Sequence, residues 1–285
     1  MTALAAGIHA DVPMETYLGL CCAGPEVQAT SLFQFYDHCP AYAWARHAAN
    51  PNREPARETD ATSLGTLCHD MLLEPAKLVD VAVKPEGMSF ATKEGKAWRA
   101  EHEGFRIVSA DDWNEAETVK AAVLFNSTSR DALRNCVPER TLIAQDPETG
   151  LWLKSRPDAM RDNLVVNLKT AADARPSYWE RKSVRPYGYH LSQALTAHVL
   201  DLLGEAPRPY AYVVVEKAAR NPIVSVYDLS FPLQELGRLI MRRTLRRWAD
   251  CVASGHWPGY GAGVTEIAAS KSAMMELETL EGEDS

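Results

Sequence analysis

Residues 141–170 read TLIAQDPETGLWLKSRPDAMRDNLVVNLKT, and this stretch decides the fold class. Two apolar runs, 141–145 and 151–156, flank the turn DPETG, a pattern typical of a β-hairpin with a five-residue loop. A third apolar run, 163–168, has the composition of a strand in the middle of a sheet that is covered on both faces. The stretch therefore predicts three successive strands.

Polar side chains stand where these strands end. Asp158 follows the hairpin, and Asn167 and Lys169 flank Leu168 at the end of the third strand. Because side chains alternate along a strand, residues 167 and 169 share one face, while Leu168 turns into the core. The short connection, 159–163, favours neighbouring strands, so Asp158 can reach the same point.

This convergence predicts a site for phosphodiester cleavage. Asp158 and Asn167 offer oxygen ligands to a divalent cation, and the carbonyl oxygen of Leu168 can add a third. Lys169 can orient an attacking water. Mg²⁺ suits so sparse a set of ligands, because it keeps several waters of its own.

The rest of the chain predicts an α/β fold, with a central mixed β-sheet flanked by helices. The domain spans 1–262 and has a helical N-terminal part, a catalytic core over about 136–230 and a C-terminal helix, and an acidic tail follows over 263–285. We expect helices over 30–48, 63–74, 91–103, from Ser109 onward, 175–183, 187–203 and 233–254, and further strands over 210–215 and 223–227.

Composition bounds the function. The chain has 285 residues, 46% hydrophobic and 24% charged, which is ordinary for a globular protein. No apolar run approaches the roughly 20 residues that span a bilayer, so we expect a soluble cytoplasmic protein. The net charge is −8, of which the tail carries −5, because it holds six acids and one base. The body at −3 leaves room for a basic groove.

The six cysteines give no zinc signature. They include no CxxC pair and no Cys/His cluster at zinc spacing, and we expect reduced thiols. Vicinal Cys21 and Cys22 with Cys39 could hold a metal, but a fourth ligand is missing.

Seven segments together resemble the PD-(D/E)xK nuclease superfamily and, within it, the RecE-type (exonuclease VIII) phage exonucleases. They cover most of residues 30–262 in the family's order and spacing, and they are Cys39-Pro-Ala41, Gly65-Thr-Leu-Cys-His69 with Leu73-Glu-Pro75, 98–110, Gly150 to Arg156-Pro-Asp158, Leu168-Lys-Thr170, Tyr189-His-Leu-Ser-Gln193 and Trp257-Pro-Gly-Tyr260.

The resemblance implies residue roles. Asp158 and position 167 become metal ligands, and Lys169 becomes the group that orients the water. His69 resembles the family's helical histidine beside the metals, and Glu139 the acid that completes the cluster. Gln193 resembles the glutamine on the helix after the metal-binding strand.

The resemblance also implies an activity. Such enzymes degrade linear duplex DNA from 5′ ends without ATP, using two Mg²⁺ ions for which Mn²⁺ can substitute. They leave a 3′ strand for a single-strand annealing protein, and they form homo-oligomeric rings, here expected as a trimer or tetramer. The expected setting is a bacterial cytoplasm, with a phage or prophage gene.

Two positions depart from the family pattern. Asn167 replaces an acid, which removes a charge while keeping a carbonyl oxygen of the same reach, and Ala197 stands where relatives often have tyrosine. Asn167 indicates either a deliberate inactivation, which we favour because the other site residues are present, or a naturally weakened enzyme. The alternatives are a catalytically dead module that binds DNA ends and a structure-specific endonuclease of the same fold.

Basic side chains predict the DNA contacts. The last helix carries five arginines at spacings that put most of them on one broad face, among them Arg242 and Arg246. Lys93 belongs to a smaller basic stripe, and Arg156 precedes the predicted metal ligand. For the arginine face, an acidic neighbouring subunit is the alternative to DNA.

Overall fold

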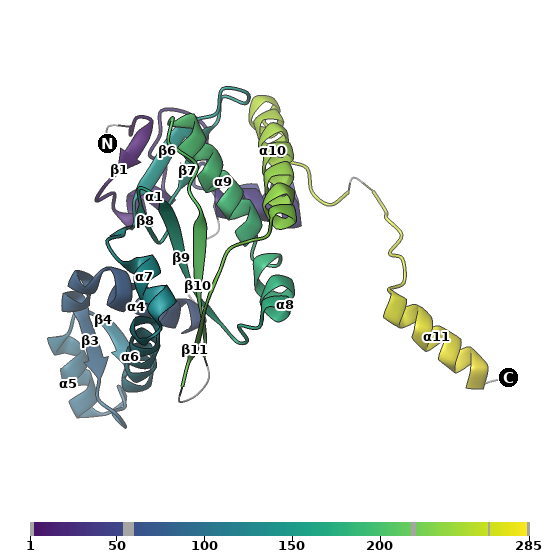
Figure 1. The fold of residues 1–285 in the computed structure, drawn as a ribbon. Coiled ribbons are helices and arrows are strands. Elements are labelled where there is room, and N and C mark those ends of the chain that lie inside the picture. Colours follow the sequence, from purple (N-terminus) through teal and green to yellow (C-terminus); the bar gives the residue numbers. More distant parts are fainter. Residues whose placement is uncertain (1–2, 54–59, 218–220, 262, 284–285) are drawn as a thin grey trace.

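A five-stranded mixed sheet forms the centre of the molecule (Figure 1). The computed structural model describes residues 3–53, 60–217, 221–261 and 263–283. The strand order is β11-β10-β9-β8-β5, with only β9 and β10 parallel. The bounds are Val137–Pro138 for β5, Ala159–Arg161 for β8, Leu164–Ala171 for β9, Tyr210–Glu216 for β10 and Ile223–Tyr227 for β11.

Helices cover both faces of this sheet, which confirms the predicted α/β class. On one face, Val166 and Leu168 pack with side chains of α4 (Asp60–Leu73) and α6 (Ala110–Phe125). On the other, Val165 packs with α9 (Tyr189–Leu202), and Ala171 packs near α8 (Pro176–Trp179). Alternation along β9 therefore feeds two cores, as the apolar run predicts.

The predicted hairpin is confirmed, but it belongs to a second sheet. Its strands β6 (Thr141–Gln145) and β7 (Trp152–Ser155) pair antiparallel around a turn in which the Asp146 carboxylate accepts a hydrogen bond from Thr149 N–H. Strand β1 (Gly7–His9) joins β6, and β2 (Glu26–Gln28) joins β7. The prediction of a single sheet missed this division, because the partners come from the distant N-terminus.

The aromatic helix predicted over 30–48 is wrong as one element. The chain forms α2 (Ala29–Asp37) and α3 (Pro40–Trp44), separated by an extended Cys39. Pro40 lacks an N–H and disfavours a helical conformation at the residue before it, so it begins a helix rather than continuing one. A short helix, α1 (Met14–Leu18), precedes β2.

A small lobe carries the chain between α4 and α6. It contains a 3₁₀ turn η1 (Pro75–Asp80), the parallel strands β3 (Val81–Lys84) and β4 (Arg106–Ser109), and helix α5 (Lys93–Glu101). The cap predicted at Ser109 is confirmed, because its hydroxyl accepts a hydrogen bond from Asp112 N–H at 3.0 Å. Helix α7 (Ser127–Leu133) then leads to β5.

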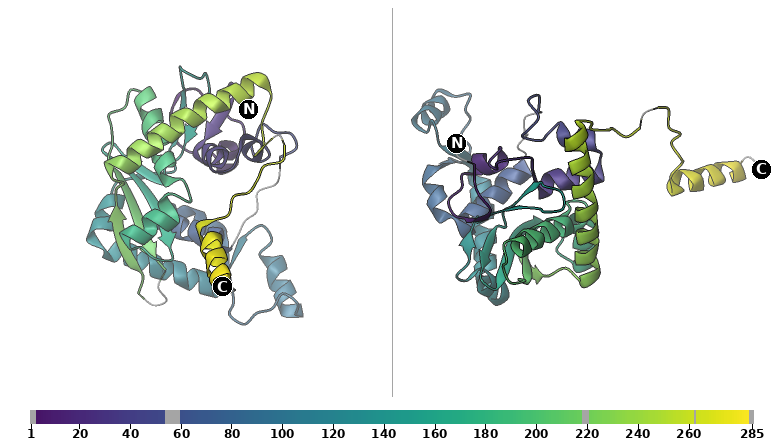
Figure 2. Two further views of the ribbon diagram at one scale, coloured as in Figure 1. Left: turned by 90° about the vertical axis from the view of Figure 1, so that its right-hand side faces the viewer. Right: turned by 90° about the horizontal axis from the view of Figure 1, so that it is seen from above.

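The remaining elements of the chain are helical. The helix predicted over 175–183 is α8 followed by a π-helical turn, η2 (Glu180–Val184), and α10 (Phe231–Ser254) packs along α9 and α2. Beyond it, an extended segment carries α11 (Lys271–Glu283) away from the body (Figures 1 and 2). Sequence reasoning predicted a tail there but no helix. None of the described helices is long and apolar enough to cross a bilayer.

Candidate active site

Asp158 lies between β7 and β8, next to the end of the central sheet. The register pairs Ala159 with Val166, so Asp158 falls opposite Asn167. The sequence placed Asp158 at the end of a hairpin strand neighbouring the next strand. In the structure that neighbour of β9 is β8, only three residues long, and β7 belongs to the other sheet. Asp158 therefore approaches β9 as predicted, but the strand that brings it there is β8, which the sequence did not predict.

Three hydrogen-bonding groups converge on one oxygen of Asp158. Leu168 N–H donates to Oδ2 at 2.6 Å, and Lys169 Nζ donates to the same atom at 3.1 Å. From the facing helix α4, His69 Nε2 lies 3.2 Å from Oδ2 and 3.3 Å from the carbonyl oxygen of Leu168. The structure thus brings together four residues that the sequence singled out.

The charges at this point shift two pKa values. Burial would raise the pKa of the Asp158 carboxyl, but the adjacent His69 and Lys169 outweigh burial and hold it well below its usual range. Burial would lower the pKa of His69, but the Asp158 carboxylate outweighs that effect and raises it. Asp158 is therefore a carboxylate near neutral pH, and it stabilises the protonated form of His69.

Strand alternation places Lys169 and Asn167 on the same face of β9, opposite the face that buries Leu168. The ammonium of Lys169 also lies 5.6 Å from the ring centroid of Tyr189, at the start of α9. Sequence reasoning gave Tyr189 no role. Its place in the motif Tyr189-His-Leu-Ser-Gln193 was the available signal. The aromatic ring limits where the Lys169 side chain can point.

Glu139 stands beside Asp158, directly after the end of β5. Its N–H donates to the Asp158 carbonyl oxygen at 3.1 Å, and its φ of +53° lies in the left-handed region, which costs a non-glycine residue roughly 1 kcal/mol. Burial, opposed by Arg156, raises the pKa of its carboxyl. Glu139 and Arg156 line a cavity of about 390 Å³ with Glu74 and Lys77.

Glu139 is nevertheless held apart from the centre of the site. Its Oε2 accepts from Arg156 Nη1 at 3.4 Å. Within the described residues, one group of three or more His, Cys, Asp or Glu side chains has all its ligand atoms within 4.8 Å of one another, and it does not include Glu139. The role of Glu139 as a cluster-completing acid therefore stays a prediction.

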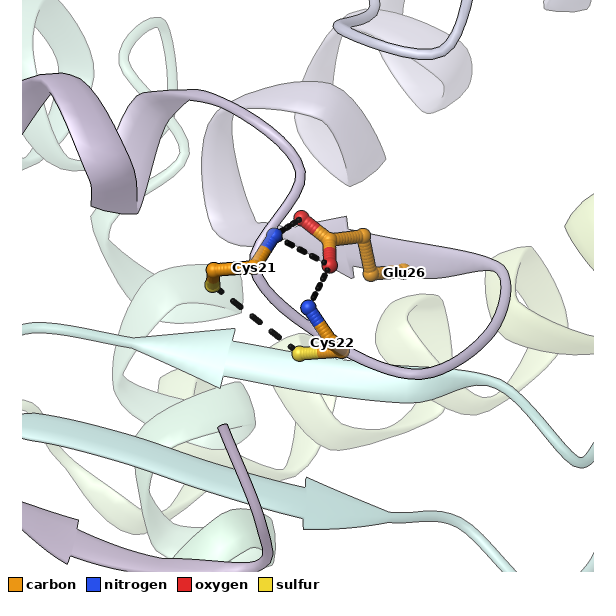
Figure 3. Close-up of side chains that lie close together, drawn as sticks. All are labelled: Cys21, Cys22 and Glu26. Atoms are coloured by element: carbon orange, nitrogen blue, oxygen red, sulfur yellow. Dashed lines mark hydrogen bonds between the residues drawn. The ribbon is translucent and has the colours of Figure 1, made fainter. Parts of the chain in front are cut away.

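That compact group is Cys21, Cys22 and Glu26 (Figure 3). All six cysteines are free thiols, and the two vicinal sulfur atoms lie 4.0 Å apart. The Glu26 carboxylate, however, accepts hydrogen bonds from the N–H groups of both cysteines and from Lys154 Nζ. The Glu26 carboxylate already accepts these hydrogen bonds and its charge is balanced by the buried Lys154 ammonium, so it does not favour binding of a cation. The group closes a loop over the hairpin sheet.

We expect Lys154→Met to destabilise the fold. Both members of the Lys154–Glu26 pair are almost fully buried, and removing the ammonium leaves an uncompensated carboxylate, at a cost of about 3–5 kcal/mol in the free energy of unfolding. Urea unfolding measures this, and the double variant Glu26→Gln/Lys154→Met should recover most of the loss. A loss below about 1 kcal/mol in the single variant, the level of an exposed pair, would contradict this account.

Gln193 does not join the group around Asp158 but is directed to Asp228, where its Nε2 donates to Oδ1 at 3.4 Å. It lines a cavity of about 560 Å³ between α9 and α10, together with Ala197. A tyrosine at position 197 would extend into this space. The catalytic role of Gln193 remains an expectation from the family resemblance.

The four predicted DNA-binding residues do not gather on one surface, although Arg242 and Arg246 lie together on α10. Arg156 is almost fully buried, and its guanidinium donates to Thr141 Oγ1 and the Val12 carbonyl oxygen, so little of it remains for a phosphate. Arg242 and Arg246 both pair with Glu148 at the hairpin turn. Lys93 is exposed at the start of α5, on the other side of the central sheet from α10 (Figure 1). Their roles in DNA binding stay predictions.

The donor set around Asp158 fits a hard divalent cation. Carboxylate, amide and carbonyl oxygens are available from Asp158, Asn167 and Leu168, and oxygen ligands are what Mg²⁺ prefers. Lys169 and His69 neutralise the carboxylate in this structure, which shows that the position favours positive charge. Asp158 is the one full carboxylate among these three ligands, so we expect weak binding of the divalent cation. Asn167 contributes a dipole where an acidic residue would contribute a charge.

Comparison with known families decides the assignment. Residues 29–271 match the family described as PDDEXK-like domain of unknown function (DUF3799). This chain belongs to that PDDEXK-like family. PD-(D/E)xK nucleases typically use divalent metals, and membership supports a nuclease function for this chain.

A solved structure agrees with this chain at the level of the fold. A crystal structure of a protein from Eubacterium rectale, which carries the provisional name exonuclease, is 11% identical and superposes with a TM-score of 0.56, covering 94% of this chain and 98% of that one. A phage-related exonuclease from Haemophilus somnus 129PT is 12% identical, and the match covers 66% of this chain and 94% of that one. Its TM-score of 0.29 is too low to indicate a shared fold. No protein with a curated description matches the PDDEXK-like chain.

Proposed function

We propose that this chain is a Mg²⁺-dependent, ATP-independent 5′→3′ exonuclease that degrades linear duplex DNA and leaves a 3′ single strand, with its activity weakened at Asn167. The observation that carries the proposal is the convergence of Lys169, His69 and the β9 backbone on Asp158 Oδ2. A carboxylate, a lysine and oxygen ligands at one strand end are the groups that metal-assisted phosphodiester hydrolysis requires. The PDDEXK-like family supports the same chemistry.

Each residue of the site has a part in this proposal. Asp158, Asn167 and the Leu168 carbonyl oxygen would hold Mg²⁺, which polarises the phosphodiester and lowers the pKa of bound water. Lys169 orients the attacking water and donates to the charge that develops on the phosphate. His69 keeps the Asp158 carboxylate in place from α4 and can pass a proton, since the neighbouring carboxylate raises the pKa of its imidazole.

Asn167 favours a second candidate, a module that binds DNA ends without cutting them. An amide in place of a carboxylate removes one negative charge from the cation site, while β9 keeps its fold and its pairing with β8. Under this alternative, DNA binding persists and hydrolysis is absent at any Mg²⁺ concentration. A chain that hydrolyses DNA faster as Mg²⁺ or Mn²⁺ is raised would contradict it.

The proposal extends to assembly and partners. A ring of three or four chains around the DNA end would make digestion processive, and a single-strand annealing protein would take up the 3′ strand that remains. Both are inferences from the resemblance to RecE-type exonucleases.

We expect the Asn167→Asp variant to digest linear duplex DNA and to leave covalently closed circles intact. With Mg²⁺ and no ATP, a label at the 5′ end should be released as mononucleotide early, while a label at the 3′ end stays on a long strand. Asp158→Asn in the same background is the matched inactive control. Cutting of closed circles would identify an endonuclease, and early release of the 3′ label would reverse the polarity.

A further inference from the structure

Helix α11 exposes an apolar stripe that nothing in the described structure covers. Its residues are exposed from Lys271 to Glu281, and Met274, Leu277 and Leu280 are 44%, 48% and 55% exposed. With Ala273, these side chains fall on one face, because they are spaced by three and four residues. A 13-residue helix alone in water is marginally stable, so α11 needs a surface to pack against.

The charge of α11 indicates what kind of surface that is. The helix contains four glutamates and one lysine, so its net charge is −3. With about 100° of rotation per residue, Glu276 and Glu278 border the apolar stripe on either side, and Glu281 falls on the face of the stripe itself in the last turn. The complementary surface would be an apolar groove with cations along its rim.

The body has such a groove, between α2, η2 and α10. It has a volume of about 510 Å³, and its lining includes Tyr36 and Leu236, which are 49% and 38% exposed. Arg181 and Arg185 also line it and are exposed, while Asp37 is its one acidic lining residue. The exposed apolar and cationic side chains that line this groove complement the apolar stripe and the glutamates of α11.

We propose that α11 is an exchange arm that docks in the α2–η2–α10 groove of a second copy of this chain. The arm is anchored at its root, because Trp257 stacks on Trp44 and the Tyr260 hydroxyl lies 3.2 Å from His38 Nδ1. Beyond this anchor, the extended segment and α11 lead away from the body, as Figure 1 and the right-hand view of Figure 2 show. Exposed Val264 and Ile267 in that segment extend the apolar surface that a neighbour would cover.

An arm and a groove at different places on one chain make a head-to-tail contact. Such contacts produce closed rings when the rotation closes, and open chains when it does not. The assembly is thus independent of the metal site, and its test does not depend on nuclease activity.

Light scattering at micromolar concentration tests the arm. The full chain should show at least twice the 31.5 kDa mass of one copy, and Leu277→Asp/Leu280→Asp should reduce it to that of a single copy. Met275→Asp is the matched control, because Met275 is 59% exposed but lies outside the stripe, and it should leave the assembly intact. A full chain that is monomeric, or a stripe variant that stays assembled, would overturn the proposal.

A mixing experiment separates docking on a neighbour from docking on the same chain. One chain carries Arg181→Glu/Arg185→Glu in its groove but keeps the arm, and the other lacks residues 263–285 but keeps the groove. Each chain alone should be monomeric, and the two together should form a 1:1 dimer. Salt at about 1 M should weaken this dimer, because the Debye length falls to roughly 3 Å and the arginine–glutamate attraction is screened. Absence of the dimer, with α11 protected from proteolysis in the full chain, would show docking in cis and contradict the proposal.

Discussion

The Asn167→Asp variant should hydrolyse linear duplex DNA on the order of 100-fold or more faster than the present chain at limiting Mg²⁺, because loss of even an outer partner of a metal ligand costs about 10- to 100-fold. Asn167 lies opposite Asp158 in the sheet register and on the face of Lys169, so the new carboxylate would stand beside the existing one. Two carboxylates at one strand end attract a divalent cation that one carboxylate holds weakly.

Initial rates of nucleotide release, measured across a Mg²⁺ titration, provide the test. Asn167→Ala is the matched control, since it removes the amide without adding charge. If Asn167→Asp were no more active than Asn167→Ala at any Mg²⁺ or Mn²⁺ concentration, position 167 would not be a ligand. The inactivating role assigned to the asparagine would then be wrong.

In the Asn167→Asp background, Lys169→Met should lower the hydrolysis rate by about 10²–10³-fold, the usual cost of losing one preorganised donor to developing charge. Lys169 Nζ donates to Asp158 Oδ2 at 3.1 Å and sits at the end of the strand that carries position 167. Methionine keeps most of the side-chain volume, so the core around β9 should survive the change.

Binding and catalysis separate in this variant. Affinity for a short duplex, measured by fluorescence anisotropy in Ca²⁺, should change by no more than a few-fold, because one ammonium among many phosphate contacts contributes little. Lys120→Met, on the outer part of α6, is the control that should leave both quantities unchanged. Loss of affinity equal to the loss of rate would assign Lys169 to DNA binding instead.

Local patterns predicted the parts of the fold that local chemistry determines. The hairpin at 141–155 was predictable because a turn rich in Asp, Pro and Gly separates two apolar runs, and the Ser109 cap because a hydroxyl three residues before an acid satisfies a helix N–H. The approach of Lys169 to Asp158 followed from the two-residue period of β9, which turns Asn167 and Lys169 to one face.

Long-range packing explains the rest. Strand β8 has three residues and no signature of its own, yet it sets the register that brings Asp158 to Asn167. Arg156 was predicted to face DNA, but the N-terminal segment carrying Val12 folds over it from more than 140 residues away. The charges of Arg242 and Arg246 meet Glu148 on a hairpin turn that no spacing rule places beside α10.

The central claim is that one cation binds between Asp158 and position 167. Crystals of the Asn167→Asp variant soaked in Mn²⁺ test it most directly, through the anomalous scattering of the ion. We predict a peak within bonding distance, about 2.0–2.3 Å, of both carboxylates and of the Leu168 carbonyl oxygen. A strong peak elsewhere, such as at Cys21, Cys22 and Glu26, with none at Asp158, would contradict the account.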